Sequence, residues 1–243
     1  MNLSLTPSLQ PSAVETPKPM PFAIMRNAHE ALRAGIRLQG RALEGADLGT
    51  FADEWKRLQR GLAVHMAMED QAMFALLDEA GGGAISAAGL PGEHEHDRRL
   101  VAAVDAALAG GDTAALRQAW SVWHDEHLQH LEHEEAVMMP LTMKTAPTPE
   151  GRARIVHERL LTPAAELPDF DWFVGWVVLM LSAHGSSAQP PSVATRVFAW
   201  GLQHASSPPQ WRRFRPIVER NCPPAMWNEL VAGFGLDSDG KIA

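Results

Sequence analysis

HLEHEEAVMM, residues 130–139, is the stretch that decides the fold, and it aligns without gaps on HMAMEDQAMF, residues 65–74. Both stretches place a histidine and a glutamate four residues apart, as His130 and Glu134 in one and His65 and Glu69 in the other. An α-helix turns about 100° per residue, so side chains four apart lie on one face with Cβ atoms about 5–6 Å from each other. Each pair can therefore bind the same cluster, and the repeat indicates a duplicated helical hairpin.

Glycine-containing turns at residues 45–49, 81–83 and 110–112 divide the first part of the chain into four helical segments. In each segment apolar residues recur at intervals of three and four, which is typical of a bundle helix. Asp112 is expected to cap the fourth helix. Each apolar stripe is interrupted by histidine, successively His29, His65, His94, and the pair His127 and His130. We therefore predict an all-α chain containing an up-down four-helix bundle.

The domain organisation follows from proline and glycine. Residues 1–21 contain scattered proline, serine and threonine and are predicted to form a flexible N-terminal tail, residues 22–145 the bundle, and residues 146–243 a helical C-terminal region packed on it. The stretch TAPTP, residues 145–149, ends the fourth helix. The candidate helices beyond it are Arg152–Leu161, Phe170–Ala183, Ser192–His204 and Ala225–Phe234.

Composition excludes several classes of protein. The formal charge is −8, and the acidic excess lies entirely in residues 1–149, so nucleic acid is not an expected partner. The longest uncharged apolar stretch, Trp172–Ala183, is about half the roughly 20 residues that span a bilayer, so no membrane insertion is expected. The single cysteine, Cys222, rules out an intrachain disulfide and a Cys-rich zinc site. Without a secretory signal, the predicted location is cytoplasmic.

Histidines and glutamates on the inner faces of the bundle point to a metal site. Each would carry a desolvation penalty of roughly 1–3 kcal/mol or more without a partner, and a pair of metal ions would use their lone pairs. Imidazole with carboxylate suits iron, manganese or zinc, and the absence of thiolate argues against copper(I) and iron–sulfur clusters. The ferritin-like di-iron pattern requires Glu-x-x-His on two helices, and only Glu93-x-x-His96 fits it here. A zinc-protease His-Glu-x-x-His motif starting at His94 is excluded, because its fifth position is Arg98.

These motifs together resemble the hemerythrin-like (HHE) family over roughly Phe22 to Lys144. The resemblance implies two non-haem iron ions, with an oxo or hydroxo bridge, in an up-down bundle. It also implies a small diatomic or peroxide ligand, in dioxygen, nitric oxide or peroxide chemistry or in iron and oxygen sensing. Carried over by position, the resemblance assigns as metal ligands His29, His65, Glu69, His94, His130 and Glu134.

Two positions depart from the oxygen-carrying members that this pattern resembles. Those members place a second histidine four residues after the first on the third helix, where this chain has Arg98, and an aspartate five residues after the histidine of the fourth helix, where it has Glu135. On a helix Glu134 lies about 40° from His130 and Glu135 about 140°, so Glu134 is the favoured ligand. One fewer histidine leaves more open coordination positions, which favours a redox or sensing role over transport.

Several further side chains keep more than one interpretation. His127 is interpretable as an extra ligand, a proton relay or a hydrogen-bonded neighbour, and we favour the neighbour. His94 shares the apolar stripe of its helix and is preferred over His96 as a ligand. Asp97 is equally suited to hold a ligand histidine or to pair with an arginine. Solvent or helix ends are expected for His124 and His133, and structural roles for His157, His184 and His204.

Three functions compete. The first is a di-iron protein that binds or reduces a small oxidant, either dioxygen, nitric oxide or peroxide. The second is an iron- or oxygen-sensing module that acts through the C-terminal helical region, and the third is a metal-free structural bundle. The chain contains no tyrosine, so tyrosyl-radical chemistry is excluded.

Overall fold

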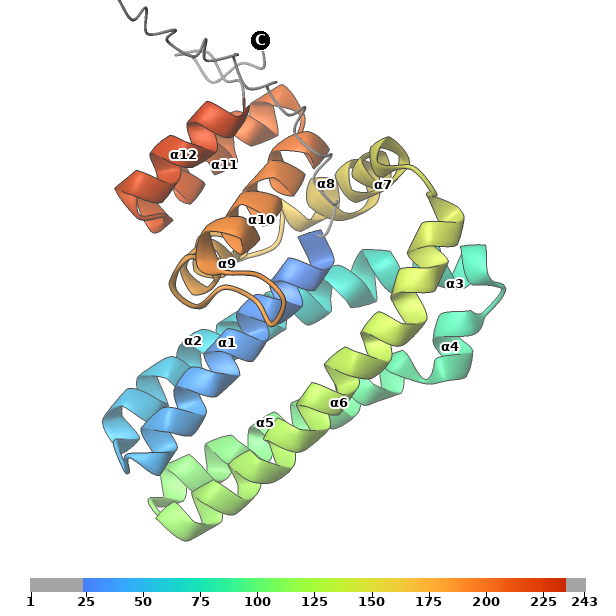
Figure 1. The fold of residues 1–243 in the computed structure, drawn as a ribbon. Coiled ribbons are helices and arrows are strands. Elements are labelled where there is room, and N and C mark those ends of the chain that lie inside the picture. Colours follow the sequence, from blue (N-terminus) through green and yellow to red (C-terminus); the bar gives the residue numbers. More distant parts are fainter. Residues whose placement is uncertain (1–23, 235–243) are drawn as a thin grey trace, which may run out of the picture.

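The computed structural model describes residues 24–234, which contain helices and no β-strand. The prediction of an all-α chain is therefore confirmed, while the predicted N-terminal tail lies outside the described residues. Four long helices, α1 (Ile24–Glu44), α2 (Leu48–Met68), α5 (Leu90–Gly110) and α6 (Thr113–Thr145), form two hairpins that lie side by side (Figure 1). α1 packs along α2 and α5 along α6, and contacts of α1 with α6 and of α2 with α5 join the hairpins into a bundle.

Local chemistry sets the ends of these helices. The side chain of Asp47 accepts a hydrogen bond from the backbone N–H of Thr50, and Asp112 accepts from Ala114 and Ala115, so the expected cap on α6 is present. Gly82 ends α3 (Phe74–Gly81) with φ of 65°, a conformation that glycine adopts at no steric cost. Between the hairpins, a short helix, α4 (Ala84–Ala88), follows the expected glycine turn at residues 81–83.

The second bundle helix is interrupted where its glutamate lies. α2 ends at Met68, a π-helical segment η1 covers Glu69–Met73, and α3 follows. A single continuous α-helix was expected here. The π-turn accommodates one extra residue, which rotates the following side chains relative to the α-helical register, and such turns are frequent at functional sites.

In the described part of the chain, the C-terminal region contains seven helical segments, which pack on one side of the bundle (Figure 1). Its elements are α7 (Pro149–Ile155), the π-helical η2 (Val156–Leu161) with the short α8 (Thr162–Ala164), α9 (Phe170–His184), α10 (Pro191–Ala205), α11 (Pro208–Asn221) and α12 (Pro224–Phe234). The four expected helices are present with shifted ends. α11 was not expected, because Pro208, Pro209 and Pro216 obscure its helical pattern, although Ser207 and Gln210 form a capping box at its start.

α9 is the central helix of this region and joins it to the bundle. It contacts α1, α2, α10 and α11, and most of its side chains are buried. The ring of Trp176 approaches Gly35 of α1 and Gly61 of α2 so closely that a Cβ atom there would lie 3.1 Å and 3.2 Å from it. The bundle and the C-terminal region therefore share one apolar core.

Within residues 24–234, none of the helices combines the length and the apolar character that crossing a membrane requires.

Candidate metal centre

The six predicted ligands converge inside the bundle. They come from α1, α2, η1, α5 and α6, and each is at most 6% exposed. The residues in order along the chain are His29, His65, Glu69, His94, His130 and Glu134. Potential ligand atoms of His29, His65, Glu69 and Glu134 all lie within 4.8 Å of one another, and so do those of His94, His130 and Glu134. Glu134 belongs to both groups.

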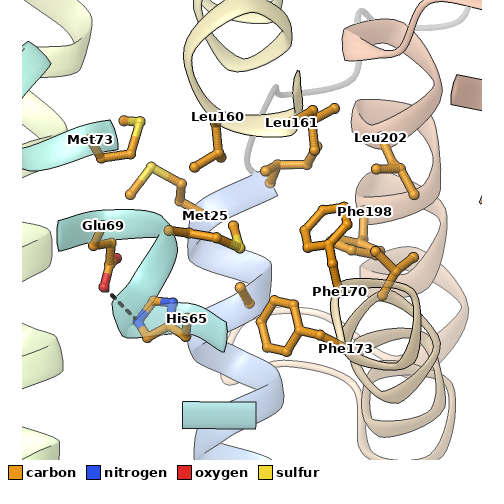
Figure 2. A pocket seen from close by; sticks show the side chains of 14 residues that line it. Met25, His65, Glu69, Met73, Leu160, Leu161, Phe170, Phe173, Phe198 and Leu202 are labelled. Carbon is orange, nitrogen blue, oxygen red and sulfur yellow. Dashed lines mark ion pairs between the residues drawn. The ribbon is translucent and has the colours of Figure 1, made fainter. Parts of the chain in front are cut away.

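Two carboxylates lie between imidazoles of different helices. Glu69 Oε2 is 3.1 Å from His65 Nε2 and 3.6 Å from His94 Nε2, while Glu69 Oε1 is 3.8 Å from His29 Nε2. Figure 2 shows the pair formed by Glu69 and His65 at the edge of a neighbouring cavity. Glu134 Oε2 is 3.5 Å from His29 Nε2 and 3.6 Å from His130 Nε2. Both carboxylates therefore lie where they could serve a metal site together with histidines of different helices.

A second set of carboxylates orients three of the histidines from outside. The Nδ1–H groups donate to Glu135 from His29 (2.9 Å), to Asp70 from His94 (2.7 Å) and to Glu93 from His130 (2.8 Å). A carboxylate on Nδ1 fixes the tautomer in which Nε2 carries the lone pair, and it makes that nitrogen a better ligand. The three Nε2 atoms are thus directed at the centre.

The outer carboxylates have cationic partners of their own. Arg33 donates to Glu135 at 2.7 Å, and Arg98 donates to Asp70 at 2.5 Å. Arg98 occupies the position where the oxygen-carrying pattern has a further histidine, so here that position supports His94 through Asp70. The His133 Nδ1–H donates at 2.7 Å to Glu93, the carboxylate that holds His130.

The inner atoms fit a metal site because they lack other partners. Among the described residues, no hydrogen bond is made by the buried Nε2 atoms of His29, His65 and His94, or by either carboxylate oxygen of Glu69 and Glu134. Each unsatisfied buried polar group costs about 1–3 kcal/mol, so this many in one place is unfavourable for a purely structural core. The same atoms are nitrogen and oxygen donors suited to iron, manganese or zinc.

The charges in this cluster shift its proton affinities strongly. Burial by itself lowers the pKa of His29, but the hydrogen bond to Glu135 and the nearby charges of Glu69 and Glu134 outweigh it and raise that pKa to about 10. Burial, followed by the charge of Glu134, raises the pKa of Glu69 well above its usual value. Burial and the neighbouring histidines lower the pKa of His65 well below its usual value.

A further buried pair lies beside the cluster. His127 donates from Nδ1 to Asp97 Oδ1 at 2.9 Å, and its ring stacks on Trp123. The ring centroid of His127 is 5.9 Å from that of His130, and its nitrogens belong to neither group of potential ligand atoms. Asp97 therefore holds His127 rather than one of the six predicted ligands.

Three further histidines, His96, His157 and His204, lie away from the cluster. His96 is exposed, and its Nε2 lies 4.0 Å from Glu126 Oε2, whereas His94 is fully buried. His94 is therefore the histidine of this pair that belongs to the cluster. His157 donates to the carbonyl oxygen of Ala205, and His204 stacks on Trp200.

Sequence reasoning did not identify the outer carboxylates, although the internal repeat contains their signal. Asp70 directly follows Glu69, and Glu135 directly follows Glu134, at matching positions of the two aligned stretches. Each reaches a histidine of the other hairpin, Asp70 binding His94 on α5 and Glu135 binding His29 on α1. The duplicated glutamate-acid pair thus crosslinks the two halves of the bundle.

A surface groove leads to the cluster. It has a volume of about 240 Å³, reaches His29 and Glu134, and is lined chiefly by apolar side chains, among them Met25, Met73 and Met138. Exposed residues such as Arg26 and Met139 lie along the same groove, so it opens to solvent.

Comparisons with curated proteins and with solved structures found no match. The family model of the hemerythrin HHE cation-binding domain matches residues 20–142, about half of the chain, and this range covers all six clustered residues. The chain belongs to the hemerythrin HHE cation-binding domain family.

Proposed function

We propose that this chain is a non-haem di-iron protein that binds or reduces a small oxidant, namely dioxygen, nitric oxide or a peroxide. The observation that carries the proposal is the set of buried Nε2 and carboxylate atoms that face one another without hydrogen-bond partners. The proposed ligands of the two iron ions are the six clustered residues, His29, His65, Glu69, His94, His130 and Glu134. Iron is chosen over manganese or zinc because of the family, since the donor set alone suits all three.

The two groups of potential ligand atoms support a pair of ions. One ion would lie among His29, His65 and Glu69, the other beside His94 and His130, and Glu134 would bridge them. When bound, two ferrous ions can supply two electrons to an oxidant by becoming ferric. The residues of the chain hold the ions, keep the imidazoles in the binding tautomer through the outer carboxylates, and exclude bulk water with a buried, apolar surrounding.

The direct test is metal analysis of the full chain purified with and without air, combined with near-ultraviolet absorption. We expect two irons per chain and an oxo-bridge absorption band after exposure to air. His65→Ala removes a proposed ligand and should reduce bound iron, whereas His96→Ala removes an exposed histidine and should leave it unchanged. Equal iron content in the two variants would contradict the assignment, and turnover of an oxidant by the reduced protein would support the redox role.

A sensing role is the second candidate, and the contact between η1 and η2 favours it. η1 carries Glu69, and η2 belongs to the C-terminal region, so a change at the metal centre has a short path to that region. If iron loading alters the packing of residues 146–234, limited proteolysis of that region should differ between the iron-loaded and chelated protein. Unchanged cleavage would remove the basis for a switch.

A further inference from the structure

A small buried cavity lies between the bundle and the C-terminal region. It has a volume of about 30 Å³ and borders His65 and Glu69 on the bundle side. Figure 2 shows Met25 and Met73 with these two residues on one side, and Phe170, Phe173, Phe198 and Leu202 on the other. Among the residues that the structure describes, no polar side chain besides His65 and Glu69 lines it.

The size and the wall of the buried cavity limit what it can hold. A water molecule requires about 10–15 Å³ of such space and two to four polar partners. The buried cavity is large enough, but within residues 24–234 its only polar lining side chains are His65 and Glu69, and both are proposed metal ligands. Apolar cavities of this kind stay dry and bind apolar gases such as xenon. The volume is too small for an organic molecule and sufficient for a diatomic one.

We propose that the buried cavity is a binding site for an uncharged diatomic molecule, such as dioxygen or nitric oxide, directly beside the metal centre. The inference rests on the proposed function and narrows it to a neutral diatomic ligand rather than hydrogen peroxide. Hydrogen peroxide would have to give up several hydrogen bonds to water on entering this apolar space. A neutral diatomic molecule such as dioxygen has no strong hydrogen bonds to water to give up, so its entry carries no such cost.

The C-terminal region builds much of this site. Leu160 and Leu161 of η2, Phe173 and Val174 of α9, and Leu202 of α10 line the cavity, and all lie outside the family match at residues 20–142. This gives the region after residue 146 a role in ligand binding, independent of any part in signalling.

A path from solvent to the buried cavity is also present. Ile24, Met25 and Met73 line both the surface groove and the buried cavity, so these side chains separate the two spaces. Methionine is unbranched and flexible, and its movement can open a passage between them. A diatomic molecule would enter by the groove, pass the two methionines and arrive next to Glu69.

The test fills the cavity with one methylene group. Val174→Ile adds it at the cavity wall, and Val178→Ile makes the same change one turn along α9 at a buried position outside the wall. Xenon is the probe, located by anomalous diffraction from pressurised crystals of the full chain, both iron-loaded and chelated. We expect xenon in the cavity of the parent protein and of Val178→Ile, and at least a fivefold lower occupancy in Val174→Ile. Val197→Ile, on α10, replaces the control if Val178→Ile does not fold.

A second arm measures nitric oxide and hydrogen peroxide with the reduced, iron-loaded protein in a stopped-flow instrument. Val174→Ile should slow nitric oxide binding several-fold and leave the peroxide reaction within twofold of the parent. Absence of xenon from the cavity, persistence of xenon in Val174→Ile, or equal slowing of both oxidants would overturn the inference. Failure to bind iron would defeat the proposed function instead, and the xenon result of the chelated protein would stand by itself.

Discussion

Replacing Glu134 by methionine should stabilise the metal-free protein while abolishing its response to iron. Glu134 is fully buried, and neither of its carboxylate oxygens makes a hydrogen bond among the described residues. It lies 3.5 Å from His29 Nε2 and 3.6 Å from His130 Nε2, but both histidines keep carboxylate partners on their Nδ1 atoms. Methionine has a similar length and is unbranched, so it can occupy the same space without a polar group.

The size of the effect follows from the group that is removed. An unsatisfied buried polar group costs about 1–3 kcal/mol, so the free energy of unfolding of the chelated protein should rise by about that amount. For a chain of about this length, 1 kcal/mol shifts the melting temperature by roughly 2–4 °C, so we expect an increase of about 2–12 °C.

Thermal unfolding of the chelated and iron-loaded proteins, followed by circular dichroism, measures both effects. Iron should raise the melting temperature of the parent and leave that of Glu134→Met unchanged, because a ligand that binds only the folded state stabilises it. The matched control is Glu135→Met, which leaves Arg33 and His29 without their shared carboxylate and should lower the melting temperature. A destabilised Glu134→Met variant that still responds to iron would refute the reasoning.

Three other predictions concern the outer carboxylates, proton release and the cysteine. Asp70→Asn weakens the partner of His94 and should reduce metal affinity about 10–100-fold in a chelator competition titration, and an unchanged affinity would contradict the supporting role. Metal must displace the proton of His29, whose pKa is about 10, so anaerobic ferrous loading at pH 7 should release at least about one proton per chain to an indicator dye. The metal affinity should therefore rise with pH up to about 10, and an affinity independent of pH would contradict this. In the chelated protein the opposite holds for stability: the ion pairs of His29 stabilise the fold fully below pH 6.5, and this stabilisation is lost as the pH rises through about 10. Burial raises the pKa of the Cys222 thiol to about 11. Disulfide reagents at pH 8 should therefore modify Cys222 at least tenfold more slowly in the folded than in the denatured protein. Equal rates would show that the thiol is accessible.

The bundle helices follow from the sequence because their signals are local. Apolar residues at intervals of three and four, glycine turns and the cap at Asp112 each act within a few residues of the chain. The π-turn at Glu69–Met73 has no local sequence signal of this kind, because the apolar spacing continues through it as in one uninterrupted α-helix. α11 was not predicted because its prolines suggest that a helix is interrupted there. In the structure, Ser207 caps the helix and Pro208 occupies its first position, where proline is tolerated, so the helix begins at this point.

The inner residues of the candidate centre were accessible to sequence reasoning and their outer partners were not. His65 with Glu69, and His130 with Glu134, are pairs within one segment, so spacing alone places each on one face. Asp70 and Glu135 act on histidines 24 and 106 residues away, and only the packing of one hairpin against the other brings them together. The sequence left Asp97 open between two partners, and the three-dimensional packing pairs it with His127.

Iron-edge anomalous diffraction from crystals of the full chain, loaded anaerobically with ferrous iron, tests the central claim most directly. Two peaks should appear inside the bundle, one beside His29 and His65 and the other beside His94 and His130, with the Glu134 carboxylate between them. Peaks confined to surface groups such as His96 and His133, or no ordered iron at all, would contradict a di-iron centre built from these six side chains.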